Sequence, residues 1–586
     1  MALSVEEIDV SRTVADELWE MLAGAGVRRC YGIVGDALNP VVDAMRRNGS
    51  LDFVHVRHEE YGAFAAVAEA RLTGRPVAVC GTAGPGVVHL INGILDARKE
   101  RVPIIVIAGD TETGVMDSET VEELNPYQFF GQAALYVGRL VNPQQLRTVV
   151  TSAVTTAITS SGPVVLSIPG DVAAADAPKG RFELRVPRPA RPPAAPADLD
   201  AMASIINEAR TVAIFGGYGC ADAGAEVRAL AEKLSAPVGY SLKGKQFLEH
   251  DNPHAVGMTG LLGYGGCWEA INGADVLLML GTDFPFSSFL PHKKVRIIQL
   301  DQDASRLGRR VPVELGVVGD VRATVSALLP MVEAKPANSL LTDAVKKTER
   351  FHRRARHYVD KGPRTKPIRP EFLAATVSDL AADDALFFAD TGTAVIWAAR
   401  HIRYGGGRRL FGSFSWASMA NAAPNAFGAQ LAYPGRQTIA LCGDGGFTML
   451  GLGDLLTQVE RRAQVVQIVL NNGGLDFVKI EQQEAGIVPF GTAFTNPDFA
   501  AVAEAMGAKG IRVEDPADLA GGVREALAHK GGPVVLDVLV DPYALALPAH
   551  VPAETAKGFT LSVTKQVFTG HLDEVVETAA HNIGLV

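Results

Sequence analysis

The sequence lacks several features that mark whole classes of protein. It has only five cysteines, at positions 30, 80, 220, 267 and 442, and none shows the paired spacing of a metal knuckle. Buried free thiols are therefore expected. No apolar run reaches the roughly 18 residues needed to span a bilayer, so any membrane contact must be peripheral. Lys and Arg (55) do not outnumber Asp and Glu (65), and they are scattered, which argues against nucleic acid as a partner.

The N-terminal residues also lack the basic start and apolar stretch of a signal peptide. Glu6, Glu7 and Asp9 make this segment acidic, and residues 1–25 read as an amphipathic helix. We therefore expect a cytoplasmic protein. No period of 20–50 residues is found, which excludes a solenoid.

What the sequence does contain is a repeated alternation of short apolar runs and helical patterns. With 586 residues, of which 47% are hydrophobic, the chain exceeds what one core usually organises. Most runs are followed by Gly, Asp or Thr and then by a helical stretch, the βα rhythm of open, mostly parallel α/β sheets. The predicted strands are Val77–Cys80, Ile104–Ala108, Val164–Ile168, Val212–Phe215, Val276–Leu280, Ile297–Leu300, Leu386–Ala389, Thr438–Leu441, Val465–Leu470 and Val534–Val538.

Two changes in composition suggest domain boundaries. A proline-dense segment lies at residues 186–196, and a polar, charged stretch covers residues 333–370. We therefore predict three α/β domains: residues 1–185, 186–345 and 346–586.

Two polar turns give the most informative chemical signal. Asp444 and its neighbouring glycines follow one predicted strand, and Asn472 follows the next. An isolated Gly-Asp-Gly is usually a plain turn, but adjacent parallel strands place both turns at one sheet edge. Magnesium prefers oxygen ligands completed by phosphate and water, and glycines at a helix start let backbone N–H groups approach phosphate oxygens. A magnesium-bound diphosphate is the natural ligand.

This pattern resembles the motif of the thiamine diphosphate enzyme superfamily. The resemblance implies metal ligation by Asp444, Asn472 and the Gly474 carbonyl, with the cofactor in contact with the turn glycines. It also implies a pyrimidine-binding first domain, a central flavin-binding domain and a diphosphate-binding third domain. The expected contacts in the first and third domains are Gly35, Gly84, Gly392, Thr393, Ala417, Met419, Gly443, Gly445 and Gly446.

In such enzymes a glutamate from another subunit's first domain pairs with the aminopyrimidine ring. The matching residue is Glu59, in Arg57-His58-Glu59-Glu60, although a glutamate at a helix N-terminus is also a common stabilising charge. His89 lies beyond a glycine-rich turn on the same domain. It is either a proton carrier or a histidine with a purely structural role.

Turns in the middle third follow the order seen in the flavin domain of pyruvate oxidases and quinone-dependent pyruvate dehydrogenases. The resemblance to this subfamily covers nearly the whole chain and is closer than that to acetolactate synthases. The expected flavin-binding residues are Gly217, Cys220, Lys243, Gly257, Met258, Thr259, Gly281, Thr282, Asp283, Asp301, Asp320 and Val321.

The substrate end of the site departs from that subfamily. Phe477 and Glu481 occupy positions that face substrate in the oxidases, but Val121 and Glu122 replace a Phe-Gln pair that contacts pyruvate. Val121 leaves more room, and Glu122 would repel a substrate carboxylate unless protonated or paired. The identity of the 2-oxo acid therefore stays open.

Three functions are compatible with these observations. The first is oxidative decarboxylation of a 2-oxo acid with thiamine diphosphate, Mg²⁺ and FAD, passing electrons to quinone or oxygen. The second is an acetolactate synthase-like carboligase, or a non-oxidative decarboxylase, with structural FAD. The third is a noncatalytic scaffold, against which the retained Glu59, Asp444 and Asn472 argue.

The resemblance also implies partners. If Glu59 acts across a subunit boundary, the smallest active unit is a homodimer, and pairs of dimers commonly form homotetramers. The C-terminal tail, residues 557–586, has apolar residues at helical spacing with few cations among them. It is either a docking helix or a peripheral contact with the inner face of a membrane.

Overall fold

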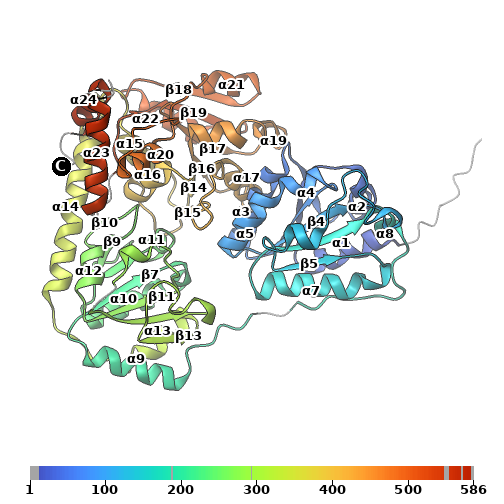
Figure 1. Cartoon of the computed structure of the whole chain (residues 1–586), viewed down its shortest axis with the longest axis horizontal. Helices are drawn as coiled ribbons and strands as arrows, with labels where there is room; N and C mark the ends of the chain where they lie inside the picture. Colours follow the sequence, from blue (N-terminus) through green and yellow to red (C-terminus); the bar gives the residue numbers. More distant parts are fainter. Residues whose placement is uncertain (1–11, 187–188, 292–293, 547–552, 569–571, 583–586) are drawn as a thin grey trace, which may run out of the picture.

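Three open α/β sheets, one in each third of the chain, organise the molecule (Figure 1). The computed structural model describes residues 12–186, 189–291, 294–546, 553–568 and 572–582. Every strand pair within the described sheets is parallel except β9 with β10, which confirms the predicted fold class.

The first sheet has the strand order β2-β1-β3-β4-β6-β5. Its strands are β1 (Arg29–Gly32), β2 (Asp52–His55), β3 (Val77–Gly81), β4 (Ile104–Asp110), β5 (Tyr136–Arg139) and β6 (Val164–Pro169). The helices of this domain are α1 (Val14–Gly24), α2 (Asn39–Asn48), α3 (Glu59–Thr73), α4 (Pro85–His89), α5 (Ile91–Glu100), α6 (Pro126–Phe130), α7 (Leu146–Thr159) and α8 (Gly170–Ala174).

The third sheet repeats this order, as β15-β14-β16-β17-β19-β18. Its strands are β14 (Leu386–Ala389), β15 (Arg409–Phe411), β16 (Thr438–Gly443), β17 (Val465–Asn471), β18 (Lys509–Val513) and β19 (Val534–Leu539). The helices around it are α15 (Pro370–Leu380), α16 (Thr393–His401), α17 (Ala422–Ala432), α18 (Asp444–Gly446), α19 (Leu455–Glu460), α20 (Asp476–Glu484), α21 (Phe499–Ala505) and α22 (Leu519–Ala528). In both sheets the strand order reverses between the first and third strands, and ligands of open α/β sheets bind beside such a reversal.

The middle sheet has the order β10-β9-β8-β7-β11-β12-β13, with its reversal between β7 and β11. Its strands are β7 (Val212–Gly216), β8 (Val238–Tyr240), β9 (Ala255–Met258), β10 (Tyr264–Gly265), β11 (Val276–Leu280), β12 (Arg296–Asp301) and β13 (Leu315–Val318). The helices are α9 (Pro196–Glu208), α10 (Gly224–Leu234), α11 (Leu242–Leu248), α12 (Cys267–Gly273) and α13 (Val321–Leu328).

The first and third domains share one hydrophobic core through α3 and α17. The alanine-rich α3 is buried on almost every side, which lets the two helices approach closely. A Cβ added to Gly428 of α17 would lie 2.0 Å from the Ala65 carbonyl oxygen, so only glycine fits there. This packing sets the position of the two domains relative to each other.

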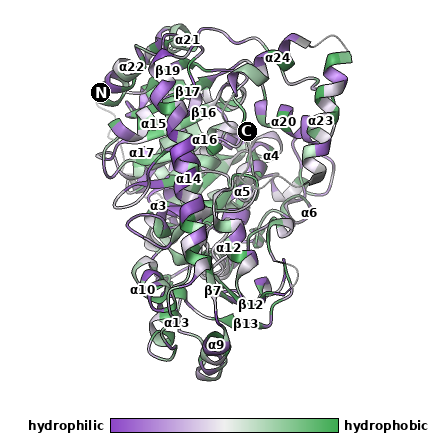
Figure 2. Cartoon of the chain, turned by 90° about the vertical axis from the view of Figure 1, so that its left-hand side faces the viewer, coloured by the Kyte–Doolittle hydropathy of each residue, from purple (hydrophilic) through white to green (hydrophobic). Residues whose placement is uncertain are grey.

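A long helix, α14 (Ser339–Lys361), leads from the middle domain to the third and runs along one edge of the molecule (Figure 1). Its exposed side is strongly hydrophilic in Figure 2. The proposed division after residue 185 falls between the first two sheets, and the one after residue 345 falls within α14.

The C-terminal tail contains the helices α23 (Ala553–Phe568) and α24 (Leu572–His581). α23 docks on the turn after α20, where Ser562 Oγ donates to the Ile487 carbonyl (2.6 Å) and Lys565 Nζ donates to the Gly486 carbonyl (2.8 Å). Among the described residues, no helix has both the length and the apolar character needed to cross a membrane.

All ten predicted apolar runs lie in strands, and all five cysteines are buried and unpaired, as predicted. The helix expected over residues 1–25 is described only from residue 12, and it begins at Val14 after the N-cap Thr13. Residues 1–11 lie outside the described part of the chain.

Candidate active site

The turns after β14 and β16 lie on either side of the strand reversal in the third sheet. Gly392 precedes α16 with φ +139°, and a Cβ there would meet no atom within 4 Å. Gly443, which precedes α18, likewise has open space at its Cβ position. The start of α16, with Thr393 as its first residue, therefore offers N–H groups and the positive end of a helix dipole to an anion.

Asp444 is almost fully buried beside these turns. Its Oδ2 accepts hydrogen bonds from the backbone N–H of Asn472 (3.0 Å) and of Gly473 (2.7 Å) and from Asn496 Nδ2 (2.8 Å). Its Oδ1 accepts from the N–H of Gly445 (2.8 Å). Burial raises the pKa of Asp444, and these hydrogen bonds oppose that rise. The carboxylate thus ties the two predicted turns together.

The Asn472 side chain lies in the same turn as the Gly474 carbonyl. Asn472 Oδ1 accepts from the Gly474 N–H (3.2 Å), and Asn472 Nδ2 donates to the Asp476 carboxylate. Gly474 and Ala493 form an isolated β-bridge. The hydrogen bonds of this bridge are made by the residues on either side of Gly474 and Ala493, so the Gly474 carbonyl takes no part in them. Burial raises the pKa of Asp476 to about 7.

These oxygens suit a hard divalent cation. One buried carboxylate, one amide and one backbone carbonyl at a turn are ligands that Mg²⁺ accepts when phosphate oxygens and water complete its octahedron. No group of three or more His, Cys, Asp or Glu able to hold a metal occurs in the part of the chain that the structure describes. A cation at Asp444 would therefore depend on neutral oxygens and on the phosphates of a ligand.

Asp390, at the end of β14, organises the segment that follows β15. Its Oδ1 accepts from the Ala422 N–H (2.8 Å), and burial raises its pKa to about 7. Ala417 and Ala420 in this segment have φ of 63° and 62°, the left-handed region that favours glycine. Met419, between them, has its Cε 3.3 Å from the Cβ position of Gly445. Met419, a predicted cofactor contact, thus lies directly against the Asp444 turn.

Gly445 is surrounded by apolar side chains besides Met419. Its Cβ position lies 2.8 Å from Leu475 Cδ2 and 3.4 Å from Phe494 Cζ. The next residue, Gly446, has its Cβ position 2.5 Å from the Asp390 carboxylate. Side chains at these two positions would collide with the wall of the site, which explains both glycines.

In the first domain, Glu59 begins α3 and is almost fully buried. Its Oε2 lies 2.9 Å from His89 Nδ1, and its Oε1 lies 3.3 Å from the Cβ position of Gly86. The His89 ring stacks on that of His58, with the ring centroids 4.6 Å apart. Glu59 and His89, predicted separately, therefore form one hydrogen-bonded pair.

The glycine turns after β1 and β3 meet beside this pair. The Cβ position of Gly35 lies 2.4 Å from the Thr82 side chain, and the Thr82 hydroxyl is buried without a partner among the described residues. Gly84 has φ +60°, and its Cβ position lies 2.9 Å from Glu122 Cα.

The loop that carries Val121 and Glu122 therefore covers the glycine turn. A hollow is lined there by Ala83, Gly84, Asp110, Glu122 and Phe130, among others. The Val121 side chain is 85% exposed in the single chain.

Phe477 and Glu481 lie one turn apart on α20. Phe477 packs against the core of the third domain, whereas Glu481 is exposed and partial burial raises its pKa.

The predicted flavin residues gather at the carboxyl ends of the middle strands. Gly217 follows β7, and its Cβ position lies 2.5 Å from the Gly281 carbonyl oxygen, so the two turns pack tightly at the strand reversal. Thr282 follows Gly281 and is buried, and Cys220 Sγ donates to the Leu280 carbonyl (3.4 Å). Burial raises the pKa of Cys220 to about 12, so its thiol is inert.

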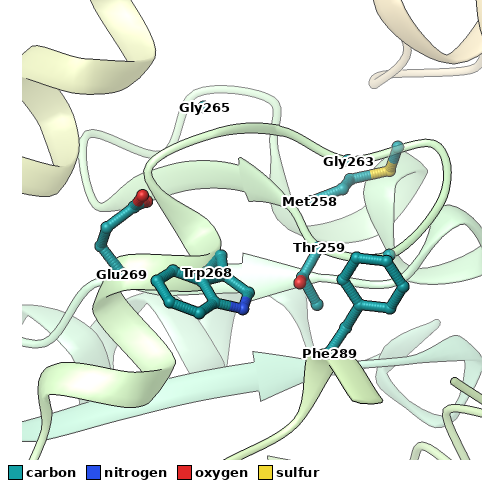
Figure 3. A pocket seen from close by; sticks show the side chains of 8 residues that line it. Met258, Thr259, Gly263, Gly265, Trp268, Glu269 and Phe289 are labelled. Atoms are coloured by element: carbon teal, nitrogen blue, oxygen red, sulfur yellow. The ribbon is translucent and has the colours of Figure 1, made fainter. Parts of the chain in front are cut away.

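Of the other predicted flavin-binding residues, some border a hollow, and others have a structural role in the fold. Thr259 lies in a hollow near Met258, Trp268 and Phe289, where its hydroxyl has no partner in the described structure (Figure 3). Gly257 lies within β9, where the register between β8 and β9 is irregular, and its φ is +87°.

The three acidic flavin candidates, Asp283, Asp301 and Asp320, have partners within the protein. Asp283 pairs with Arg306 and Arg310, each at 2.8 Å. Burial raises the pKa of Asp301, which accepts from the Asp303 N–H (2.9 Å). Asp320 caps α13, in which Val321 is the first residue and is buried, and Asp320 also accepts from Gln302.

Lys243 lies at the meeting point of all three domains. Its Nζ donates to Glu100 Oε2 (2.6 Å) in the first domain and to Ser415 Oγ (2.5 Å) in the third. Burial lowers the pKa of Lys243, and Glu100 opposes this effect. This link between the domains could not be inferred from the sequence.

Asn496, which supports the Asp444 turn from a loop, was also missed by sequence reasoning. Asn496 Nδ2 donates to Asp444 and to Asn471 Oδ1 (2.9 Å), and Asp537 accepts from Asn471 Nδ2 (2.9 Å). Asn496 stands before a proline in a stretch with no helical or strand pattern, so only its position in space reveals its role.

The fold and the site define a three-domain α/β enzyme in which two domains of like topology frame a place for a diphosphate-bearing cofactor. Three family models match the chain in succession: "Thiamine pyrophosphate enzyme, N-terminal TPP binding domain" over residues 12–129, the central domain over residues 199–328, and the C-terminal TPP binding domain over residues 390–538. The chain belongs to this thiamine pyrophosphate enzyme family, and thiamine diphosphate is its cofactor.

Individual relatives span almost the whole chain. A Bacillus subtilis (strain 168) protein named as thiamine pyrophosphate-containing, YdaP, is 34% identical over 95% of this chain and 96% of its own length. Pyruvate oxidase of Lactiplantibacillus plantarum is 29% identical over 89% of this chain and 87% of its own. Acetolactate synthase of Mycobacterium bovis is also 29% identical, over 92% and 89%.

Proposed function

We propose that the protein catalyses the oxidative decarboxylation of a 2-oxo acid, pyruvate or a related one, with thiamine diphosphate, Mg²⁺ and FAD, and that quinone or oxygen accepts the electrons. The observation that carries this proposal is the meeting of the Asp444 carboxylate and the Asn472 turn, which follow β16 and β17 beside the strand reversal of the third sheet. The similarity to a pyruvate oxidase over most of the chain supports the oxidative reaction.

The residues of the third domain would hold the cofactor. Asp444, Asn472 and the Gly474 carbonyl would bind Mg²⁺, and the open turns at Gly392 and Gly443 would receive the diphosphate. Bound thiamine diphosphate supplies the electron sink for loss of carbon dioxide, and a flavin supplies the acceptor for the electron pair. Met419 and the apolar surface around Gly445 would exclude water from the reacting end.

Glu59 would hold the proton exchanged with the aminopyrimidine ring. Its burial keeps the carboxyl group away from water, and its hydrogen bond to His89 gives a path for that proton toward the exposed edge of α4. Glu122, over the Gly84 turn, would lie on the substrate side and repel the substrate carboxylate by charge.

We further propose that two copies of the chain complete the site. Large apolar side chains that border the predicted site are exposed in the single chain, among them Val121 (85%), Met449 (65%) and Phe490 (87%). A second first domain packed there would bury this surface and bring its Glu59 to the Asp444 turn, as expected for a homodimer or a homotetramer.

The middle domain would hold FAD beside the β7/β11 reversal. The packed glycine turns there and the unpartnered Thr259 hydroxyl in its hollow support this assignment. Of the two roles considered for the C-terminal tail, the contact of α23 with the Ile487 carbonyl favours a docking helix over a peripheral membrane contact.

A second candidate is an acetolactate synthase-like carboligase, or a non-oxidative decarboxylase, with a structural FAD. The chain is 29% identical to an acetolactate synthase, the same identity as to the pyruvate oxidase, which supports this second candidate. Anaerobic mixing of the flavin-loaded enzyme with a panel of 2-oxo acids separates the two: bleaching of the flavin supports oxidation, whereas product formation with the flavin still oxidised supports the carboligase.

A further inference from the structure

One face of α5 carries three polar residues at four-residue spacing: Asn92, Asp96 and Glu100. Residues spaced by four lie on one side of a helix. Asp96 and Glu100 are both buried, which is unusual for carboxylates without a specific role. The face points at a segment of another domain, residues 413–418, that is more than 300 positions away in the sequence.

Each of the three residues holds that segment by a short hydrogen bond. Asp96 Oδ1 accepts from Ser413 Oγ (2.6 Å), and Glu100 Oε1 accepts from the Ser415 N–H (2.6 Å). Asn92 accepts from Trp416 Nε1 (2.6 Å) and donates to Ser418 Oγ (3.0 Å). We call this set of contacts the α5 seam.

The segment needs such support because its backbone is strained. Ala417 in the segment and Ala420 just after it both adopt the left-handed conformation, which a non-glycine residue keeps only where its surroundings fix it. Within the segment, Ser413 Oγ also accepts from the Ser418 N–H (3.0 Å). Ser413 is thus the point at which the seam and the internal turn meet.

The charges of the seam are partly compensated. Glu100 pairs with Arg71 of α3 and with Lys243 of the middle domain. Asp96 has no such cation at hydrogen-bonding distance, and its Oδ2 is buried without a partner among the described residues. A buried carboxyl group without a compensating cation lowers the stability of the fold. We therefore attribute the presence of Asp96 to its contact with residues 413–418.

We propose that Asn92, Asp96 and Glu100 are positioning residues for thiamine diphosphate, because they hold the strained segment that sets Met419 against Gly445. This inference rests on the cofactor site of the proposed function. None of the three residues needs to touch the cofactor, since their effect passes through residues 413–418.

The test is a calorimetric titration of the flavin-loaded protein with thiamine diphosphate at saturating Mg²⁺, which measures the binding affinity. Asp96→Ala and Ser413→Ala should each weaken binding by about tenfold, and the double variant should bind no more weakly than the weaker single variant, because both changes remove the same Asp96–Ser413 hydrogen bond. Flavin content and the unfolding temperature of the cofactor-free protein should stay near those of the wild type.

The control is Lys99→Gln, an exposed position on the same helix, which should bind like the wild type. Binding by Asp96→Ala and Ser413→Ala within twofold of the wild type would overturn the inference, as would parallel loss of flavin and thiamine diphosphate. Should Asp96→Ala fail to fold, Ser413→Ala alone decides, since it removes one hydroxyl and leaves both carboxylates. A wild type that binds thiamine diphosphate but shows no flavin reduction would contradict the proposed function and leave this inference standing.

Discussion

The replacement Asp444→Asn separates the role of this residue in cofactor binding from its role in folding. In the wild type, three donors converge on Oδ2 and one on Oδ1. An amide oxygen at the Oδ2 position keeps the three donors, but the amide nitrogen then faces the Gly445 N–H. Leaving that buried donor unsatisfied costs about 1–3 kcal/mol.

The same replacement removes a buried charge, which offsets part of this cost. Burial raises the pKa of Asp444, so the folded state holds a proton more tightly than the unfolded state does. The cofactor-free wild type therefore loses stability as the pH rises from the ordinary carboxyl pKa to the raised folded value, and Asp444→Asn lacks that loss. The net change in the free energy of unfolding near neutral pH should stay within about 2 kcal/mol.

Cofactor binding should respond much more strongly. An amide cannot replace a charged metal ligand, so we expect the affinity for Mg²⁺ and thiamine diphosphate to fall at least about 100-fold, or about 2.7 kcal/mol. Calorimetric titration measures the affinity, and urea unfolding of the cofactor-free protein across pH measures the stability. The control is Asp379→Asn, an exposed residue paired with Arg403 in the same domain. An Asp444→Asn protein that binds within tenfold of the wild type would refute the reasoning.

Three further predictions follow from other parts of the structure. Glu59→Gln should keep flavin and metal-diphosphate binding while lowering turnover by about 100-fold or more, as measured by carbon dioxide release; unchanged turnover would exclude Glu59 as the activating acid. Gly428→Ala should lower the free energy of unfolding, measured by urea titration, by about 1–3 kcal/mol, because its Cβ position lies 2.0 Å from the Ala65 carbonyl oxygen. The control Gly521→Ala has open space in α22 and should be neutral or slightly stabilising. Equal effects of the two changes would contradict the close approach of α3 and α17. Glu122→Gln should lower the KM for pyruvate by about threefold at low salt and less at high salt, because it removes a like charge; a raised KM would show that Glu122 binds substrate instead.

The central strands could be predicted because they are buried on both faces. Runs such as Val276–Leu280 and Val465–Asn471 are nearly continuous in apolar residues. Edge strands such as β13 and β18 are only partly buried, and β18 also contains Lys509 and Arg512, so neither strand shows the continuous apolar run of a central strand. β10 has only two residues, which pair with β9 because the chain turns back between Met258 and Tyr264.

The site was predictable where a motif brings neighbouring strands together. Asp444 and Asn472 follow adjacent strands, so their meeting could be inferred from the βα rhythm. The α5 seam and Asn496 could not be inferred, because polar residues on a helix or in a loop look the same in sequence whether they face water or another domain. The contact of Glu59 with His89 depends likewise on how α3 and α4 pack.

The most direct test is a single anaerobic turnover in which carbon dioxide and flavin absorbance are measured together on the fully loaded enzyme. The proposed function predicts that one flavin is reduced for each carbon dioxide released from the preferred 2-oxo acid. Release of carbon dioxide with the flavin remaining oxidised would contradict it.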